Sequence, residues 1–578
     1  RPQVEGTRAK PVLGGWKPVW RSPGANVSRE AVMVPSKAAL VNKIRWAIFE
    51  RKCLKWERDA QDNSRDSIAE PQVTSSITIS QWARTQFPYF TSCSNTHPTP
   101  KHPIYFENAG GSQVPQTVIT TMTQALSHRH RDVQGNLWKR LARQTLLRIV
   151  GAKSNSSCPN DNDDHVCFLG NNATSLLHTL SQKILSQWIS ETGHTNNLEP
   201  KTYEIVIGRH NHDANIQPWL TLAANPPPNI HITTKFWNPN TNIAECLSSS
   251  TRLIALPHAS NVLGTLYNIP QLCDTVANIT HNQAIIVVDG VTAAPHRFVD
   301  LGSDEMSHVD YYVVSCHKLF GPHLGALIAK RTAVEQLRGS ISIEDGAAVE
   351  DTDVYKQWER GTVNYEACAG VHGVGSYFEQ LVVSSAVGSS SSRSVTSIHE
   401  DIQQASECTS QQPLHLHPPT NNSNRNSDDP PLVSIPTIRE AYRLMQNTEH
   451  FLVTALIAGL RQSNRVHLLE DRMDKSRLPI VSFIHDMISS QIIVSHCSDH
   501  DIVCRYGCFL SPRIVQRELE RIRATAQSRD NTNTNTMDKD DIQPNRDSHA
   551  VVRLSLLHYN TVSEVNHCLQ VLQLIPGW

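Results

Sequence analysis

The sequence lacks the features that would assign a protein to a membrane or to nucleic acid. No apolar run in its 578 residues approaches the length of a bilayer-spanning helix, because charged residues or prolines interrupt each one. Lys and Arg (53) almost balance Asp and Glu (54), and a formal net charge of -1 provides no field that would steer the chain onto nucleic acid or an anionic membrane. We therefore expect no nucleic-acid and no membrane partner.

The 13 cysteines lack the spacing of a structural framework. Their number is odd, they form no CxxC pair, and no histidines stand at zinc-binding spacing from them, which argues against a disulfide scaffold and a metal site. This usage predicts a reducing compartment and a cytoplasmic protein. The chain starts at Arg1, and residues 1–60 contain thirteen Lys and Arg against five acidic residues, so organellar targeting stays open as an alternative.

Composition divides the chain into two folded regions and several polar segments. Residues 1–80 read as a poorly ordered N-terminal extension, and residues 81–383 as a large domain. Residues 384–431, which contain SSSSRS and PPTNNSNRNSDDPP, read as a disordered insertion. Residues 432–578 read as a small C-terminal domain with a second disordered loop at 527–549.

Short apolar runs alternate with helical stretches between Tyr105 and Leu381, which is typical of an α/β protein with a mostly parallel central sheet flanked by helices. The small domain is expected to be α+β and to begin with a long helix over Thr437–Leu460. Ligands collect at the carboxyl ends of strands in such sheets, so polar residues that follow strands are candidate site residues. The predicted strands are His165–Leu169, Tyr203–Ile207, Ile230–Thr234, Arg252–Leu256, Ala284–Val288 and Tyr311–Ser315.

The first predicted strand ends in FLGNNATSLLHTL, where Gly170 and Asn171 turn the chain and a helix is expected to start near Thr174. The exposed amides and the positive dipole end of a helix suit a phosphate group. Asn and Thr are also ordinary helix caps, so a purely structural interpretation stays open.

Two charged residues follow apolar strands that are expected to be neighbours. Asp289 ends the apolar run of VVDGVTAAPH, where a carboxylate needs a cationic partner unless it caps a turn. Lys318 lies in YYVVSCHKLFGPHLGALIA, and a desolvated lysine has a lowered pKa and forms imines with aldehydes. Together they suit pyridoxal 5'-phosphate (PLP), because a buried Asp keeps the pyridine nitrogen protonated. Ser315 and His317 lie beside the lysine and are suited to hold a phosphate.

Seven motifs, which occur in the same order along this chain as in the family, resemble those of class V aminotransferases and cysteine desulfurases. SCHKLFGP resembles the family's SxHK segment, VVDGVTAAPH its DGxQxxPH segment, and HASNVLGT is similar to the SNVLGT of SufS-type desulfurases. The others are YFENAGGSQVP, GRHNHDANIQPW, WERGTVNYEACAG and VRLSLLHYNTVSEV. The resemblance covers residues 100–380 and 435–575, is closest to a poorly characterised desulfurase-like branch, and implies the PLP-dependent transferase fold (fold type I).

The resemblance implies a role for each matched residue. Lys318 would hold PLP as a Schiff base and move protons, Asp289 would face the pyridine nitrogen, and His212 would stack on the ring. Arg553 would bind the substrate α-carboxylate, assisted by Arg505. The remaining cofactor contacts would be Asn261 and Thr292 near the ring oxygen, Asn171, Asn172, Ser315 and His317 at the phosphate, and Gly361 and Thr362 at the phosphate of the partner subunit in a homodimer.

The sequence departs from the family at two functional positions. Thr292 stands where the family has a Gln beside the ring oxygen, and it is too short to make the same hydrogen bond without a shift or a bridging water. Desulfurases carry a nucleophilic cysteine on a loop that reads VCRYGCFLSPR here, and the usual cysteine position is Leu510. Cys508 lies two positions away and is either a catalytic, sulfur-accepting nucleophile or an inert packed thiol.

These observations favour a PLP-dependent enzyme that acts on an amino acid. Removal of sulfur from cysteine or a related substrate is the leading interpretation, and a sulfur-acceptor protein would then be a further partner. The alternatives are an aminotransferase, an epimerase or a kynureninase-like lyase. A catalytically silent scaffold is a third hypothesis, against which the presence of both Lys318 and Asp289 argues. Cys316, Trp219 and Trp358 are expected in the core.

Overall fold

The computed structural model describes residues 79–91, 102–128, 134–152, 164–192, 200–338, 352–359, 361–390, 430–474, 476–530 and 550–578. Most of the predicted extension at 1–80, insertion at 384–431 and loop at 527–549 lies outside these residues. Two helices reach past the predicted boundaries, because α11 (Tyr365–Ser390) and α15 (Pro512–Asp530) continue into the segments that were expected to be disordered.

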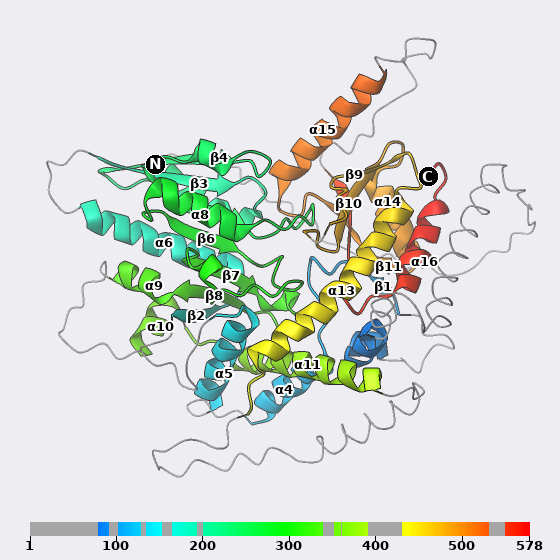
Figure 1. Ribbon diagram of the computed structural model, residues 1–578, viewed down its shortest axis with the longest axis horizontal. Coiled ribbons are helices and arrows are strands. Elements are labelled where there is room, and N and C mark those ends of the chain that lie inside the picture. The colour runs from blue at the N-terminus through cyan, green and yellow to red at the C-terminus, as the bar shows by residue number, and fades with distance from the viewer. Residues whose placement is uncertain are drawn as a thin grey trace, which may run out of the picture. The chain divides into compact units, whose positions relative to one another are not determined.

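A seven-stranded mixed sheet forms the centre of the large domain, in the order β2-β8-β7-β6-β5-β3-β4 (Figure 1). Strands β3 to β7 run parallel to one another, whereas β8 is antiparallel to both β2 and β7. The six predicted strands are confirmed, and β8 is the strand that the sequence did not predict. Their bounds are β2 His165–Gly170, β3 Lys201–Gly208, β4 Ile230–Trp237, β5 Thr251–Pro257, β6 Ile285–Asp289, β7 Tyr311–Ser315 and β8 Gly325–Lys330.

Helices cover both faces of this sheet. Alternate residues of β7 divide between two apolar clusters: Tyr312 and Val314 lie in one, and Tyr311 and Val313 in the other. Burial on both faces explains why the strands are continuously apolar. The first layer contains α4 (Gln116–Ser127), α5 (Gln134–Ile149), α8 (Ile269–Thr280), α11 and α13 (Ile435–Leu460), and the second contains α6 (Ala173–Thr192), α7 (Gln217–Ala224), α9 (Arg331–Arg338) and α10 (Thr352–Trp358). The expected core residues Trp219 and Trp358 are buried in the second cluster.

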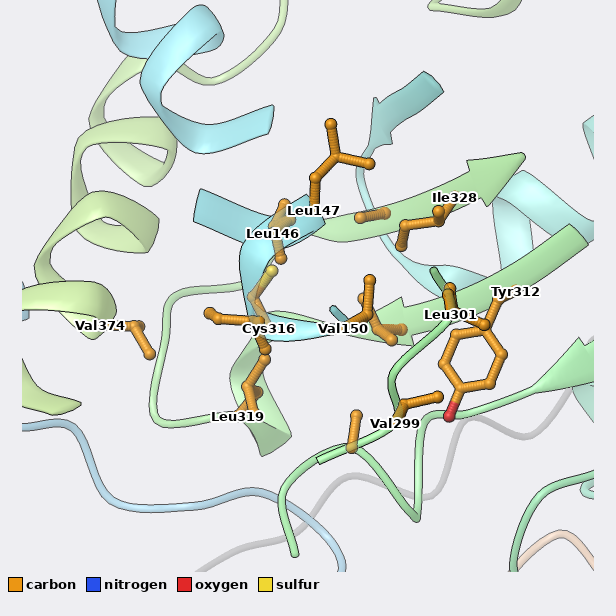
Figure 2. Packing of buried hydrophobic residues seen from close by; sticks show 14 of the residues in the cluster. Leu146, Leu147, Val150, Val299, Leu301, Tyr312, Cys316, Leu319, Ile328 and Val374 are labelled. Carbon is orange, nitrogen blue, oxygen red and sulfur yellow. The ribbon is translucent and has the colours of Figure 1, made fainter. Parts of the chain in front are cut away.

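The turn η4 (Cys316–Lys318) is anchored in the first layer. Cys316 and Leu319 are each 1% exposed and lie in the same cluster as Leu146 and Val150 (Figure 2). Lys318 stands between these two anchors along the chain and is itself partly exposed. Burial of both neighbours fixes the backbone that carries the lysine, and Cys316 has the packing role that was expected.

An antiparallel four-stranded sheet, in the order β12-β13-β10-β9, forms the centre of the small domain. Its strands are β9 (Val466–Leu468), β10 (Ile480–His485), β12 (Arg505–Gly507) and β13 (Val551–Ser555), and its helices α13, α14 (Ser490–Asp499), α15 and α16 (Val562–Gln573) confirm the α+β class and the predicted long helix. Strand β1 (Ile104–Tyr105) pairs in parallel with β11 (Ile502–Val503), which joins the start of the large domain to the small one.

Shorter elements complete the described chain. These are a helix over residues 79–86, α3 (Pro88–Thr91), and the 3-10 turns η1 (Asp213–Asn215), η2 (Ile243–Cys246) and η3 (Asp304–Met306). Within the ranges that the structure describes, no helix combines the length and the apolar character that a membrane span requires.

Candidate active site

Residues from distant parts of the sequence meet along one edge of the large sheet. Strand register places Gly170, Gly325 and Ser315 in one row across β2, β8 and β7. Asp289 ends β6, the parallel neighbour of β7. Lys318 follows β7 by one turn, so the carboxyl ends of three strands bring their polar side chains to the same edge.

Asn172 lies at the start of α6 and caps it. Its Oδ1 accepts a hydrogen bond from the backbone N–H of Ser175 at 2.8 Å, which is the capping geometry that the structural interpretation described. Both Asn171 and Asn172 are exposed. Gly325 packs against the backbone of Asn172 so closely that a Cβ at this glycine would collide with it. The helix start is therefore held against the sheet edge, with its first amides available to an anion.

Ser315 and His317 form a hydrogen-bonded pair beside the lysine. The Ser315 hydroxyl lies 2.8 Å from Nδ1 of His317, whose ring stacks on His323 with centroids 5.1 Å apart. Burial, followed by the positive charge of Lys318, lowers the pKa of His317 to about 4. The ring is therefore neutral near pH 7, and the pair offers hydrogen-bonding groups without a formal charge.

Lys318 is the amine at the centre of this edge. Burial lowers its pKa to about 8, and the nearby charge of Arg553 acts in the same direction. Asp289 and Glu107 oppose this shift through their negative charges. A much larger share of Lys318 is therefore neutral and nucleophilic near pH 7 than of an ordinary lysine.

Asp289 is a buried carboxylate, with 8% of its surface exposed. The backbone N–H of Val291 donates to its Oδ1 at 3.0 Å. Burial raises the pKa of Asp289, while this hydrogen bond and the charge of Lys318 act against the increase. A carboxylate in this environment is stabilised by a cation that comes close to it.

His212 is held as a neutral ring. The backbone N–H of Ala214 donates to Nδ1 at 3.1 Å, so Nε2 carries the proton of the neutral imidazole. Burial lowers the pKa of His212 to about 4, with further contributions from Lys318 and Arg553. The charges of both cations therefore act on the His212 ring.

Arg553 is buried and donates hydrogen bonds to two other residues. It is 3% exposed, its Nη2 donates to Oε1 of Glu107 at 2.9 Å, and its Nη1 donates to the backbone oxygen of Asn261 at 3.1 Å. The guanidinium carbon lies 3.9 Å from the ring centre of Phe509. Arg505 lies opposite Arg553 in the β12–β13 pairing, and its Nε is 3.7 Å from the same Glu107 oxygen.

Sequence reasoning missed Glu107. It belongs to the motif YFENAGGSQVP, yet no role was assigned to it, and it is 5% exposed. Burial raises its pKa, and the charges of Arg553 and Arg505 oppose this. The signal was present, because a carboxylate shortly after the apolar pair of β1 needs a cationic partner for the same reason as Asp289.

The loop that carries Cys508 has an unusual backbone. Phe509 and Leu510 both have φ of 53°, the left-handed region that residues with a side chain rarely adopt. Asn261 holds this loop, since its Nδ2 donates to the Phe509 carbonyl at 2.9 Å and its Oδ1 accepts from the Ser511 hydroxyl at 2.8 Å. Asn261 therefore links the loop to Arg553.

Cys508 and Leu510 differ in their exposure to solvent. Cys508 is partly buried and packs against an apolar cluster that includes Val262 and Leu263. Leu510, at the usual cysteine position of the family, is 59% exposed.

The remaining predicted residues lie at the surface or carry no described contact. Gly361 and Thr362 are exposed, and Gly361 has φ of 80°, which favours glycine. Thr292 is partly buried in the turn that follows Asp289. His258, which is not among the predicted site residues, has a structural partner, because its Nδ1 lies 2.7 Å from the hydroxyl of Tyr312.

Comparison with known proteins identifies the family of the chain. The family model of the aminotransferase class V matches residues 104–424, which is more than half of the chain. The chain belongs to this family. Among similar proteins, the aminotransferase-like protein FGM3 of Gibberella zeae is 26% identical over 494 residues, which cover 82% of this chain and 95% of that protein.

The sequence match to a desulfurase-like protein covers a small share of this chain, whereas the structural match to a cysteine desulfurase covers most of it. The cysteine desulfurase-like protein ustD of Aspergillus flavus is 36% identical over 152 residues, 24% of this chain and 33% of that protein. The apo structure of a cysteine desulfurase from Thermococcus onnurineus aligns over 85% of this chain and 97% of its own, with a TM-score of 0.55 and 19% identity. This structural likeness confirms the predicted fold class of a class V enzyme.

Proposed function

We propose that this class V enzyme binds PLP covalently at Lys318 and acts on an amino acid. The observation that carries the proposal is the convergence of Lys318 and Asp289 from neighbouring strands. The charge of the buried Arg553 acts on Lys318, and the charges of both cations act on the neutral His212. A lysine with a lowered pKa beside a buried carboxyl group suits the chemistry of the cofactor.

The residues present fit the cofactor. A protonated pyridine nitrogen would supply the cation that the buried carboxylate of Asp289 needs. The lowered pKa of Lys318 favours imine formation with an aldehyde. The Ser315 hydroxyl and the first amides of α6 offer donors for a phosphate. When bound, PLP supplies an electron sink that stabilises negative charge on the substrate carbon next to the amino group.

The chain's own residues would bind and orient the substrate. Arg553 offers a fixed, permanently charged fork for the α-carboxylate. Lys318 would accept and return the proton at the substrate Cα, because its amine has a pKa near the working pH. His212 would cover the cofactor ring as a neutral, flat group.

Removal of sulfur from cysteine or a related substrate is the reaction that we propose first. Cysteine desulfurases and desulfurase-like proteins recur among the relatives and the similar structures. The proposal includes a homodimer, in which Gly361 and Thr362 reach the cofactor of the partner subunit, and a sulfur-acceptor protein.

A second reaction class is supported by one observation. Cys508 packs against an apolar cluster, and Leu510 takes the exposed loop position where desulfurases have their cysteine. Transamination, epimerisation or a kynureninase-like cleavage would need Lys318 and Arg553 but no thiol.

The covalent attachment is tested directly. The purified protein with PLP should be yellow, and borohydride should bleach it and fix the cofactor on Lys318, as read by peptide mapping. Lys318→Ala should lose the colour, whereas the control Lys330→Ala, at the far end of the adjacent strand β8, should keep it. An adduct on another lysine would refute the proposal. A panel of amino acids, followed for sulfide, alanine, pyruvate and ammonia, then identifies the reaction.

A further inference from the structure

Glu107 and Arg553 form a buried ion pair at the place where the substrate carboxylate would bind. The two residues are 5% and 3% exposed, and Oε1 lies 2.9 Å from Nη2. Burying both charges costs desolvation of each, so such a pair is weak evidence for a stabilising role. A bound amino acid would need the guanidinium that Glu107 already occupies.

The pairing between the two side chains is incomplete. Oε2 of Glu107 and Nε of Arg553 are buried and have no hydrogen-bond partner among the residues that the structure describes. An arginine binds a carboxylate most strongly through two parallel N–H donors, and Nε and Nη2 form one such edge. Glu107 makes one hydrogen bond to this edge, which leaves the Nε–H donor available to a ligand.

Arg505 offers Glu107 an alternative partner. It lies opposite Arg553 on the adjacent strand, its side chain is 71% exposed, and its Nε is 3.7 Å from the Glu107 oxygen that Arg553 binds. Gly110 leaves room for this carboxylate, because a Cβ at that position would collide with Oε1. A small movement of the Glu107 side chain toward Arg505 would free the Nε–Nη2 edge of Arg553.

We propose that Glu107 is a positioning residue that competes with the substrate carboxylate for Arg553 and moves to Arg505 when the substrate binds. This inference rests on the proposed function, because it needs a ligand carboxylate at Arg553. While Glu107 is paired, its charge neutralises the guanidinium and opposes a second anion. Arg553 therefore binds carboxylates weakly unless the rest of the ligand contributes to binding.

The test uses the full chain with PLP bound and measures propionate binding by titration calorimetry. Propionate has a carboxylate but no amino group, so it cannot react with the cofactor. Glu107→Gln keeps an acceptor for Nη2 but removes the charge, and it should bind propionate about tenfold more tightly than the parent. With the amino-acid substrate, KM should fall by a similar factor. Glu107→Asp keeps the charge and should bind propionate as weakly as the parent.

Glu449→Gln is the matched control. Glu449 is 1% exposed, pairs with His296 at 2.9 Å, and also has a buried oxygen without a partner in the described residues. This variant should leave propionate binding unchanged. Equal or weaker binding by Glu107→Gln would overturn the inference, and so would a gain in Glu449→Gln of the same size. Loss of the Lys318 adduct in the parent itself would instead refute the proposed function.

Discussion

Asp289 and Lys318 follow neighbouring parallel strands, β6 and β7, and each charge shifts the pKa of the other. Burial raises the pKa of the acid and lowers that of the amine, so both side chains are destabilised in their charged forms when no ligand is present. The attraction between the two charges offsets part of the free-energy cost of burying them. A cofactor with a cationic ring nitrogen and an aldehyde would relieve both.

Asp289→Asn should slow the reaction without lowering the stability of the fold. Without the carboxylate, the pyridine nitrogen loses the charge that keeps it protonated, and exchange of the substrate α-proton should fall by about 100-fold or more. Because the pKa of Asp289 is raised in the folded protein, its charged form costs stability above that pKa. The cofactor-free variant should therefore melt at or above the temperature of the parent near pH 7.

Proton exchange followed by NMR in deuterated water is the measurement, with Asp310→Asn as the control. Asp310 precedes β7 at the opposite end of the sheet, accepts from the N–H of Ile286 at 2.8 Å, and has a pKa that burial raises to about 6. Its replacement should leave exchange unchanged. Exchange at the parental rate in Asp289→Asn would exclude the assigned role.

The rate of PLP capture by cofactor-free protein should depend on pH through Lys318. Burial lowers its pKa to about 8, and the neutral amine is the form that attacks the aldehyde. Capture should rise about tenfold per pH unit below pH 8 and level off above it. Stopped-flow absorbance gives the rate, and Lys318→Ala should show no capture at any pH. A rate that still climbs steeply above pH 9 would mean that Lys318 has an ordinary pKa.

Much of this edge of the sheet could be predicted because its charged and polar residues come directly after apolar strands in the sequence. Asp289 and Lys318 were recognised from charges that directly follow apolar runs, and the structure does place them at the carboxyl ends of adjacent strands. Strand β8 was missed because its short run GALIAK directly follows the lysine motif, and its antiparallel direction depends on pairing with β2 as well as β7. Pairing across such sequence distances is not encoded in local periodicity.

The contacts between the two domains could not be predicted in the same way. Glu107 reaches Arg553, and Asn261 reaches Phe509, across more than two hundred positions of sequence. The resemblance supplied a role for Asn261 near the cofactor ring, but not its hydrogen bonds to the loop of Cys508. These contacts depend on how the small domain docks on the large one, which no single segment determines.

Cys508 decides whether the desulfurase reaction uses a thiol of this chain. A cysteine on this loop, near a bound substrate and Arg553, would attack the substrate sulfur as a thiolate. The left-handed backbone at Phe509 and Leu510 is strained, and a rearrangement that relaxes it would change where Cys508 points. Attack on the substrate sulfur would leave a persulfide on Cys508 and release alanine, and an added thiol reductant would then free the sulfur as sulfide. With that reductant present, Cys508→Ser should abolish sulfide and alanine formation from cysteine while the yellow colour of the Lys318 adduct remains.

Two further variants serve as a control and as a rescue for this test. Cys246→Ser removes a partly exposed thiol on η2, in another part of the large domain, and should leave sulfur release intact. Leu510→Cys, added to Cys508→Ser, puts a thiol at the exposed position that desulfurases use and should restore release. If Cys508→Ser releases alanine and sulfide as fast as the parent, Cys508 is a packing residue in its apolar cluster. The transaminase, epimerase and lyase reactions then become the better explanation of the site, because they need Lys318 and Arg553 but no thiol.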